Sequence, residues 1–180
     1  MQLQRLSRFI SYILRHNPDV IDIEMDSHGW VRVDELINGI NKTNKSIDFV
    51  TLCQIVDNDN KNRFSFNDDK TKIRANQGHS IDVDLELEEI IPPSVLYHGT
   101  AEKFLESIMK NGILKKSRKY VHLSSDMDTA VKVGIRHGQV AVLVIDTKKM
   151  YKEGFKFYLS ENNVWLTDIV PYKYIIKIER

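Results

Sequence analysis

A polar segment near the middle of the chain divides the sequence into two parts and constrains the fold more than any other feature. It runs from the glycine-containing stretch Ala75–Ser80 through closely spaced acidic residues to Pro92-Pro93. Glycine and proline interrupt helices and strands, and acidic runs favour solvent over a core. We therefore expect an N-terminal lobe over residues 1–80, a linker over 81–93 and a C-terminal lobe over 94–180.

The N-terminal part has the pattern of a small helical domain with a hairpin. Apolar residues recur at helical spacing over 3–16, and Pro18 ends that helix. Two further helices are expected over 34–40 and 48–58, and alternating residues over 63–74 predict two paired strands. Three helices followed by a hairpin are the element order of a winged helix.

The C-terminal part is expected to contain more strands than helices. A buried strand is predicted at Val95-Leu96-Tyr97, followed by a helix over 101–110 that Gly112 closes. Further strands are expected over 120–124, 140–146, 155–159, 164–167 and 173–179. Both parts together predict an α+β protein of two lobes.

His98, Gly99 and Thr100 directly follow the strand expected at 95–97 and are the first candidates for a ligand site. A glycine at a strand end lets a ligand approach the backbone, and a threonine before a helix can cap it. A strand end followed by a helix N-terminus favours binding of a phosphate group. The alternative is a structural histidine in an ordinary strand-to-helix turn, and these residues alone do not decide between the two.

The polar face of the first helix carries basic residues. Four residues spaced by three or four positions share that face: Arg5, Arg8, Tyr12 and Arg15. Such a stripe is usually a solvated face. Because Pro18 stops the helix, Arg15 and His16 lie in its last turn, where the helix dipole favours cations. That position suits anion binding, and it is equally typical of ordinary capping.

Composition limits which partners and which cellular compartment are expected for the protein. The formal net charge is only +1, so any contact with nucleic acid has to come from local groups of arginine and lysine. The single cysteine, Cys53, excludes an intramolecular disulfide and fits a reducing compartment. The sequence has no apolar run of roughly 18 residues and no signal-peptide core near its start. We therefore expect a cytoplasmic protein without a membrane partner.

Common catalytic motifs are missing from the sequence. It has no paired cysteines or His-Glu-x-x-His for a metal, no Walker loop or Gly-x-Gly-x-x-Gly for a nucleotide, and no Gly-x-Ser-x-Gly. What remains is a group of arginines and histidines at the ends of predicted elements. Guanidinium groups stay charged and match phosphate oxygens in pairs, so this group favours phosphate binding.

Seven short motifs occur along nearly the whole chain. They are Leu-Arg-His-Asn-Pro at 14–18, Gly-Trp-Val at 29–31, Asn-Arg-Phe at 62–64, Ile-Arg-Ala-Asn-Gln-Gly-His-Ser at 73–80, Tyr-His-Gly-Thr at 97–100, Val-His-Leu-Ser at 121–124 and Val-Gly-Ile-Arg-His-Gly at 133–138. In this order they resemble one family, the NAD-dependent tRNA 2′-phosphotransferases.

This resemblance implies a winged-helix-like RNA-binding lobe followed by an ADP-ribosyltransferase-type lobe that binds NAD. The expected partners are NAD, consumed as a co-substrate, and an RNA with an internal 2′-phosphate, such as a tRNA. The expected products are 2′-hydroxyl RNA, nicotinamide and ADP-ribose 1″,2″-cyclic phosphate. We further expect a monomer that uses no metal.

The resemblance also implies which residues form the site. The catalytic set falls on Arg15, His16, Arg63 and Arg136. The NAD-binding set falls on Tyr97, His98, Gly99, Thr100, Arg118, His122, Leu123, Ser124 and Val164. Most ADP-ribosyltransferases carry a glutamate where this chain has Val164, and we interpret its loss as the RNA phosphate needing no general base. Tyr120 stands where the family suggests a histidine, and both side chains can stack and donate.

Two other functions remain open from the sequence. A winged-helix binder of nucleic acid would explain the arginines of the first helix but leaves the strands around residues 97 and 122 without a role. An ADP-ribosyltransferase that caps 5′-phosphorylated nucleic-acid ends would keep the ADP-ribose on its product. The remaining histidines, His28, His79 and His137, are interpreted as structural, and the tryptophans, Trp30 and Trp165, as core residues.

Overall fold

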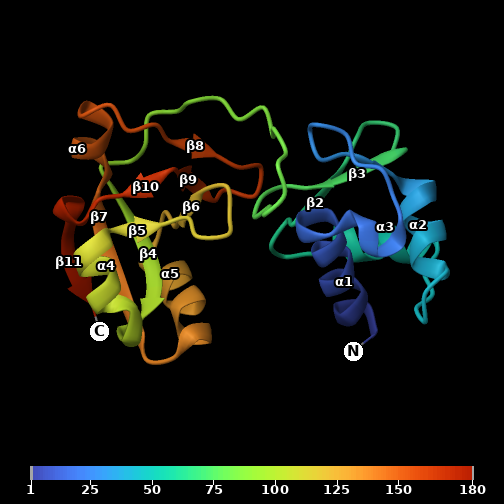
Figure 1. Cartoon of the computed structure of the whole chain (residues 1–180), viewed down its shortest axis with the longest axis horizontal. Coiled ribbons are helices and arrows are strands. Elements are labelled where there is room, and N and C mark those ends of the chain that lie inside the picture. The colour runs from blue at the N-terminus through green and yellow to red at the C-terminus, as the bar shows by residue number, and fades with distance from the viewer. Residues whose placement is uncertain (1, 180) are drawn as a thin grey trace. The chain divides into compact units, whose positions relative to one another are not determined.

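The structure of the protein is a computed structural model that describes residues 2–179 (Figure 1). Helices and antiparallel strands occur in both halves of the chain, which confirms the α+β class. The chain divides into two compact units, Met1–Glu86 and Leu87–Arg180, which we call unit 1 and unit 2. Within residues 2–179, every helix is too short or too polar to span a bilayer.

Unit 1 combines helices with one three-stranded sheet. Its elements are α1 (Gln2–His16), the 3-10 helix η1 (Pro18–Ile21), β1 (Val31–Arg32), α2 (Val33–Asn41), α3 (Phe49–Asp57), β2 (Phe64–Phe66) and β3 (Lys72–Ala75). The strands are antiparallel in the order β1-β3-β2. The three helices and the hairpin expected from the sequence are confirmed, and β1 adds a third strand to the hairpin.

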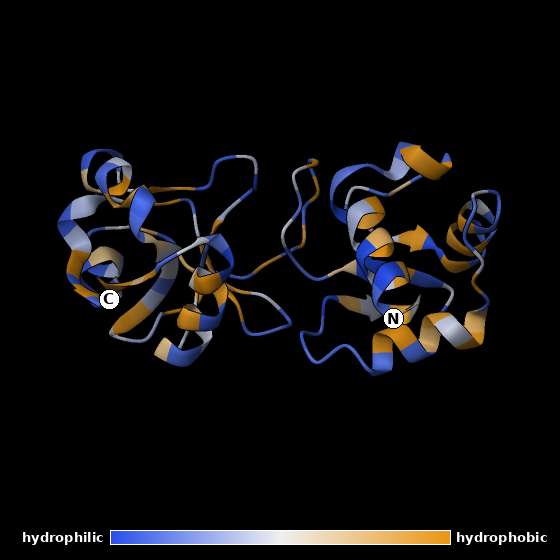
Figure 2. Cartoon of the chain, turned by 90° about the horizontal axis from the view of Figure 1, so that it is seen from below, coloured by the Kyte–Doolittle hydropathy of each residue, from blue (hydrophilic) through white to orange (hydrophobic). Residues whose placement is uncertain are grey.

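Local sequence sets the ends of these helices. α1 ends at His16, and the backbone N–H of Asn17 donates to the carbonyl oxygen of Tyr12 at 3.1 Å before Pro18 redirects the chain. α3 begins after Asp48, whose carboxylate accepts a hydrogen bond from a backbone N–H at 2.7 Å. Figure 2 shows hydrophobic and hydrophilic segments alternating along the helices, which is typical of helices that cover a core.

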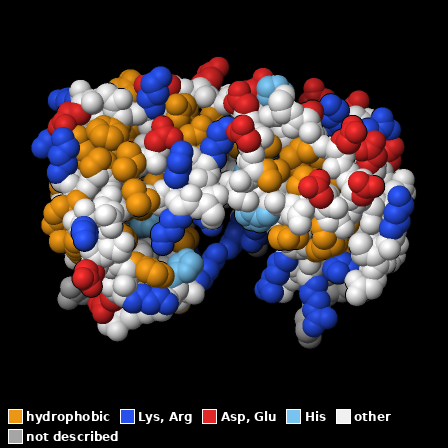
Figure 3. All heavy atoms as spheres, in the orientation of Figure 1, with side chains coloured by type: hydrophobic (Ala, Val, Ile, Leu, Met, Phe, Trp, Pro, Cys, Tyr) orange, Lys and Arg blue, Asp and Glu red, His pale blue; other side chains and the backbone are white. Residues whose placement is uncertain are grey.

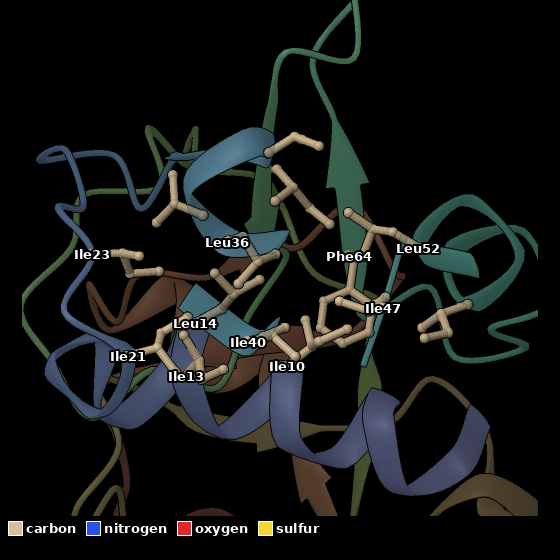
Figure 4. Close-up of a cluster of buried hydrophobic side chains, with 14 of the residues drawn as sticks. Ile10, Ile13, Leu14, Ile21, Ile23, Leu36, Ile40, Ile47, Leu52 and Phe64 are labelled. Carbon is tan, nitrogen blue, oxygen red and sulfur yellow. The ribbon is translucent and has the colours of Figure 1, made fainter. Parts of the chain in front are cut away.

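The core of unit 1 forms where α1 packs against α2. Ile10, Ile13 and Leu14 point from one side of α1 toward Leu36 and Ile40 of α2 (Figure 4), and all of them are fully buried. Burying an aliphatic side chain contributes roughly 1.5–3 kcal/mol. This packing fixes the rotation of α1 about its own axis, so Arg5 and Arg8 point to solvent, whereas Arg15 is half-buried.

Unit 2 contains three small antiparallel sheets. Its strands are β4 (Val95–Ala101), β5 (Ile113–Leu114), β6 (Val121–Leu123), β7 (Val140–Asp146), β8 (Tyr158–Leu159), β9 (Trp165–Thr167), β10 (Ile169–Val170) and β11 (Ile175–Glu179). Its helices are η2 (Glu102–Phe104), α4 (Leu105–Asn111), α5 (Met127–Gly134), η3 (Ile135–His137), α6 (Thr147–Lys152) and η4 (Tyr172–Tyr174). The strand orders are β11-β7-β4, β6-β9-β8 and β10-β5. The sequence did not predict α6 or the β5–β10 pair.

The strand β4 is longer than the sequence predicts. It continues through His98, Gly99 and Thr100, each of which lies opposite a residue of β7. The predictions of a strand end at Tyr97 and of a helix cap by Thr100 are therefore wrong, because the next helical turn has no side-chain cap. The physical reason is the length of β7, which offers backbone hydrogen bonds along the whole of β4.

Gly99 allows a helix to pack directly on β4. A Cβ atom at this position would lie 1.7 Å from the carbonyl oxygen of Ala130 and 2.9 Å from the nitrogen of Gly134. A Cβ atom at Gly134 would in turn lie 2.7 Å from the carbonyl oxygen of Thr100. The two glycines bring the backbones of α5 and β4 into contact, so α5 fills the space into which a side chain at position 99 would point.

The two tryptophans have different surroundings. Trp165 is 7% exposed and belongs to the core of unit 2, as expected. Trp30 is only half-buried, and the guanidinium of Arg74 lies 4.5 Å from its ring centroid. The interpretation of Trp30 as a core residue is wrong because it directly precedes β1, an edge strand of the sheet.

Candidate functional site

The last turn of α1 holds the first two predicted catalytic residues. His16 is exposed, and its Nδ1 lies 2.9 Å from Oγ of Ser80. The backbone N–H of Ser80 donates to the carbonyl oxygen of Arg15, also at 2.9 Å. These contacts satisfy a carbonyl of the last helical turn and orient the imidazole. The C-terminal end of the helix dipole favours positive charge on both side chains.

Arg63 lies in the loop that precedes β2. Its Nη1 donates to the carboxylate of Asp59, and its backbone N–H donates to the same carboxylate at 2.6 Å. The backbone N–H of Lys61 adds a third hydrogen bond at 3.2 Å. The side chain of Asp59 is 4% exposed, whereas that of Arg63 is 30% exposed. Asp59 therefore anchors one edge of the guanidinium inside unit 1 while part of the group stays accessible.

One short segment after β3 connects the surroundings of these three residues. The backbone N–H of Asn76 donates to the carbonyl oxygen of Arg63 at 2.9 Å. Gly78, at a φ of +88°, lies against Arg15, since a Cβ atom there would be 3.6 Å from its Nη1. The segment ends at Ser80, which contacts His16. The structure thus brings all three predicted residues of unit 1 to one stretch of chain.

Sequence reasoning missed the residues that hold this set, namely Asp59, Asn76 and Ser80. Asn76 and Ser80 belong to the motif at 73–80 that carries the family resemblance, but neither has a charge or a periodicity that indicates its role. Asp59 lies in a stretch rich in Asp and Asn that is typical of a helix end. Only the fold shows that its carboxylate turns inward.

In unit 2, several predicted NAD-binding residues gather where β4 meets β6. Tyr97 and Ser124 exchange two backbone hydrogen bonds, at 2.9 and 2.7 Å. Nδ1 of His98 lies 3.0 Å from the carbonyl oxygen of His122. Nη1 of Arg118 lies 3.0 Å from Nδ1 of His122. Direct contacts therefore link five of the predicted residues.

These contacts fix the proton of His98. A carbonyl oxygen only accepts, so Nδ1 of His98 carries the proton and donates it to the carbonyl oxygen of His122. Burial lowers the pKa of His98 below its ordinary value, and the positive charge of Arg118 acts in the same direction. At neutral pH, His98 is therefore an uncharged ring whose Nε2 is a hydrogen-bond acceptor.

The other predicted residues of unit 2 differ in their access to solvent. Leu123 is 1% exposed and Thr100 is 5% exposed, so their side chains belong to the interior. Val164 directly precedes Trp165, which pairs with Leu123 across β6 and β9. Arg136 lies in η3 and is exposed, and within residues 2–179 it has no acidic partner.

The predicted site residues of unit 1 and those of unit 2 suit different ligand groups. Unit 1 presents two arginines and a histidine, which match the oxygens of a phosphate group. Unit 2 presents a neutral imidazole acceptor beside a guanidinium, which suits a ligand with both hydroxyl groups and negative charge. In the part of the chain that the structure describes, no group of three or more His, Cys, Asp or Glu side chains could hold a metal ion.

Known proteins are similar to this chain over nearly its whole length. The family model described as "RNA 2′-phosphotransferase, Tpt1 / KptA family" matches residues 1–169. The chain belongs to this family. A probable RNA 2′-phosphotransferase of Fusobacterium nucleatum is 59% identical over 172 residues, which are 95% of this chain and 96% of that protein. A relative with the same description from Flavobacterium johnsoniae is 54% identical over 170 residues, covering 94% and 93% of the two chains. Another from Acaryochloris marina is 47% identical over 178 residues, covering 99% and 98%.

Membership of the RNA 2′-phosphotransferase family confirms the resemblance that the seven motifs indicated. The chain is accordingly an enzyme, a transferase of the RNA 2′-phosphotransferase class. A family that handles an RNA phosphate agrees with the arginine and histidine set of unit 1. The winged-helix binder without catalysis, one of the two alternatives from the sequence, is thereby excluded.

Proposed function

We propose that this RNA 2′-phosphotransferase moves an internal RNA 2′-phosphate to ADP-ribose and consumes NAD as its co-substrate. In the first step an oxygen of the 2′-phosphate attacks the anomeric carbon of the nicotinamide ribose, and nicotinamide leaves with the bonding electron pair. In the second step the 2″-hydroxyl of that ribose attacks phosphorus, and the RNA 2′-oxygen leaves and takes up a proton. The products are 2′-hydroxyl RNA, nicotinamide and ADP-ribose 1″,2″-cyclic phosphate.

The arrangement of elements supports a role for each unit. Three helices, the β2–β3 hairpin and the order β1-β3-β2 support a winged-helix-like, RNA-binding unit 1. An ADP-ribosyltransferase-type, NAD-binding unit 2 is supported by the places of three residues that the resemblance assigns to NAD binding. His98 lies on β4, His122 on β6 and Val164 directly before β9, and β6 pairs with β9.

The observation that carries the proposal is that one segment of unit 1 holds Arg15, His16 and Arg63 together. A phosphate monoester carries about −1.5 to −2 charges at pH 7, so several cations are needed to hold it near a pyrophosphate. Two guanidinium groups can each bind phosphate oxygens in pairs, and His16 can donate a proton to the leaving 2′-oxygen. Arg136 of unit 2 is the fourth member of this proposed set.

The residues around β4 and β6 fit the hydroxyl and phosphate groups of NAD. Nε2 of the neutral His98 ring can accept a hydrogen bond from a ribose hydroxyl, and Arg118 can bind a phosphate oxygen. NAD supplies the ADP-ribosyl group together with a leaving group. The attacking RNA phosphate is already an anion and needs orientation more than a general base. This agrees with Val164 in place of the glutamate of other ADP-ribosyltransferases.

The experiment that tests the proposal is incubation of the protein with a 2′-phosphorylated oligoribonucleotide, with and without NAD. We expect the RNA to lose its phosphate only with NAD, and nicotinamide and the cyclic phosphate to appear in equal amounts. Release of inorganic phosphate without NAD would contradict the proposal. A stable ADP-ribosylated RNA that keeps its phosphate would instead indicate the capping transferase.

NAD binding should depend on the protonation state of His98. Because burial lowers the pKa of His98, the ring stays neutral as the pH falls from about 8 to about 6.5, where an ordinary histidine is half-protonated. We expect constant NAD affinity over that range and a loss of affinity below the lowered pKa, where Nε2 no longer accepts. Isothermal titration at several pH values measures this.

The matching variant is His98→Ala. It should weaken NAD binding over the range from about pH 6.5 to about pH 8, where the wild-type ring is neutral. The binding of phosphorylated RNA should be nearly unchanged, because the RNA phosphate is assigned to unit 1. Wild-type NAD affinity in this variant would show that the assignment of His98 is wrong.

Asp59→Asn should weaken catalysis through Arg63. The amide oxygen can still accept the backbone N–H of Arg63, but it no longer attracts the guanidinium, so the side chain loses its fixed position. A hydrogen bond to a charged group contributes about 1.5–3 kcal/mol, so we expect kcat to fall roughly ten- to hundredfold. The KM for NAD should stay unchanged in steady-state kinetics.

Two controls separate this positioning role from a general effect on unit 1. Asp57→Asn removes an exposed carboxylate at the end of α3 and should leave kcat unchanged. In an Arg63→Ala background, Asp59→Asn should cost nothing further, because the group through which it acts is gone. Additive losses in the double variant would mean that Asp59 acts by another route.

A further inference from the structure

Arg5, Arg8 and Tyr12 of α1 have no role in the function proposed so far. Within α1, Arg5, Arg8, Tyr12 and His16 follow one another at intervals of three, four and four residues. At 100° per residue these positions lie within about 80° of one another around the helix. Arg5 and His16 are about 16 Å apart along the axis. These four residues therefore form a narrow row that ends at His16, a proposed catalytic residue.

Arg5, Arg8 and Tyr12 of this row are accessible to a ligand. Arg5 and Arg8 are exposed, and within residues 2–179 neither has an acidic partner. Tyr12 is 44% exposed. Its hydroxyl accepts a hydrogen bond from Nδ2 of Asn17 at 3.2 Å, and its ring centroid lies 6.2 Å from that of His16. Tyr12 is thus an oriented aromatic ring between the arginines and the site.

The charge of unit 1 is unevenly distributed, and α1 is its basic part. Unit 1 has 14 Asp and Glu residues against 11 Lys and Arg, yet the first acidic residue of the sequence is Asp19. Figure 3 shows Lys and Arg side chains around the N-terminal end of α1, while Asp and Glu side chains gather toward the opposite edge of the unit. A polyanion would therefore be attracted to α1 and repelled by much of the remaining surface of unit 1.

We infer that Arg5, Arg8 and Tyr12 bind the RNA strand next to the 2′-phosphorylated nucleotide. This inference rests on the proposed function, which places the 2′-phosphate at Arg15 and His16. The two arginines match backbone phosphates of the flanking nucleotides, and the Tyr12 ring offers a face on which a neighbouring base can stack. The row makes the enzyme prefer an internal 2′-phosphate that is flanked by several nucleotides.

The test compares a 2′-phosphorylated dinucleotide with a single-stranded RNA of about ten nucleotides that carries the same group internally. In the full-length variant Arg5→Gln/Arg8→Gln, KM for the longer RNA should rise roughly tenfold at about 0.1 M salt, and KM for the dinucleotide should not change. The slope of log affinity against log salt should fall by about 1.4, because two single-strand phosphate contacts are lost. kcat should be unchanged for both substrates.

A matched control removes two exposed lysines elsewhere in unit 1. Lys42→Gln/Lys70→Gln makes the same change in net charge, at the end of α2 and in the β2–β3 turn, and should not alter KM for either RNA. Tyr12→Ala should raise KM for the longer RNA by about fivefold or more, because stacking on a base is lost. Tyr12→Phe keeps the ring and should bind the longer RNA like the wild type.

The outcomes separate this inference from the proposed function. If the wild-type protein fails to transfer the phosphate from either RNA in the presence of NAD, the proposed function is wrong. If the wild type is active and the α1 variants have the wild-type KM for the longer RNA, the polar side of α1 is only a solvated face. If the α1 variants raise KM equally for both RNAs, the inference is also overturned, because the row would then act on the reacting group itself.

Discussion

Arg63→Ala is expected to slow the second chemical step more than the first, so that 2′-phospho-ADP-ribosylated RNA accumulates. The first step needs the RNA phosphate aimed at the anomeric carbon, and the anion supplies its own nucleophilicity. In the second step charge develops on the phosphoryl oxygens and on a poor leaving oxygen. Removing a hydrogen-bond donor therefore slows the second step more than the first. Removing one such donor typically costs about 2.7–4 kcal/mol, which is roughly a hundred- to a thousandfold in rate.

His16→Ala should show the same pattern, because the departing 2′-oxygen then lacks its proton donor. Arg63→Lys should restore little activity, because an ammonium keeps the charge but lacks the paired donors of the guanidinium. A gel time course with radiolabelled RNA and NAD measures both steps in one experiment. If both alanine variants consume the RNA slowly without an intermediate band, these residues act in binding or in the first step.

Gly99→Ala is expected to destabilise unit 2 by about 3 kcal/mol or more. The added methyl group would lie 1.7 Å from the carbonyl oxygen of Ala130, and backbone atoms cannot move aside as the end of a flexible side chain can. Either α5 separates from β4 or β4 distorts next to His98. We therefore expect a lower thermal midpoint together with weaker NAD binding.

Gly154→Ala provides the control for this variant. Gly154 has a φ of +92°, and beyond its two neighbours in the chain no atom lies within 4 Å of its would-be Cβ. Alanine therefore meets only backbone strain there, on the order of 1 kcal/mol. Thermal unfolding should rank wild type above Gly154→Ala and Gly154→Ala above Gly99→Ala. If the two variants melt together, the close contact between α5 and β4 is not formed in solution.

Local patterns in the sequence were enough to predict most of unit 1. The helices over 3–16, 34–40 and 48–58 and the hairpin over 63–74 each depend on spacing and turn residues within a short window. Pro18 placed Arg15 and His16 at the end of α1 because proline acts on its immediate neighbours. The order of seven motifs predicted the family, which the comparisons confirm.

Contacts between residues far apart in the chain decided the rest. The sequence ended the strand at Tyr97 because glycine and threonine resemble a turn, but β7 pairs with β4 through Thr100. It also did not predict that α5, some 30 residues later, packs directly against Gly99. Both features depend on contacts with partners that no local window of the sequence contains.

The same distinction applies to the candidate site. The sequence by itself determined which chemical groups are present: arginines and histidines at the ends of elements, without a metal motif. The tertiary structure decided what holds them, through the inward-turned carboxylate of Asp59, the Ser80 contact of His16 and the carbonyl oxygen that takes the proton of His98. The type of a residue is written in the sequence, but the direction of its side chain and the position of its proton depend on neighbours that only folding brings close.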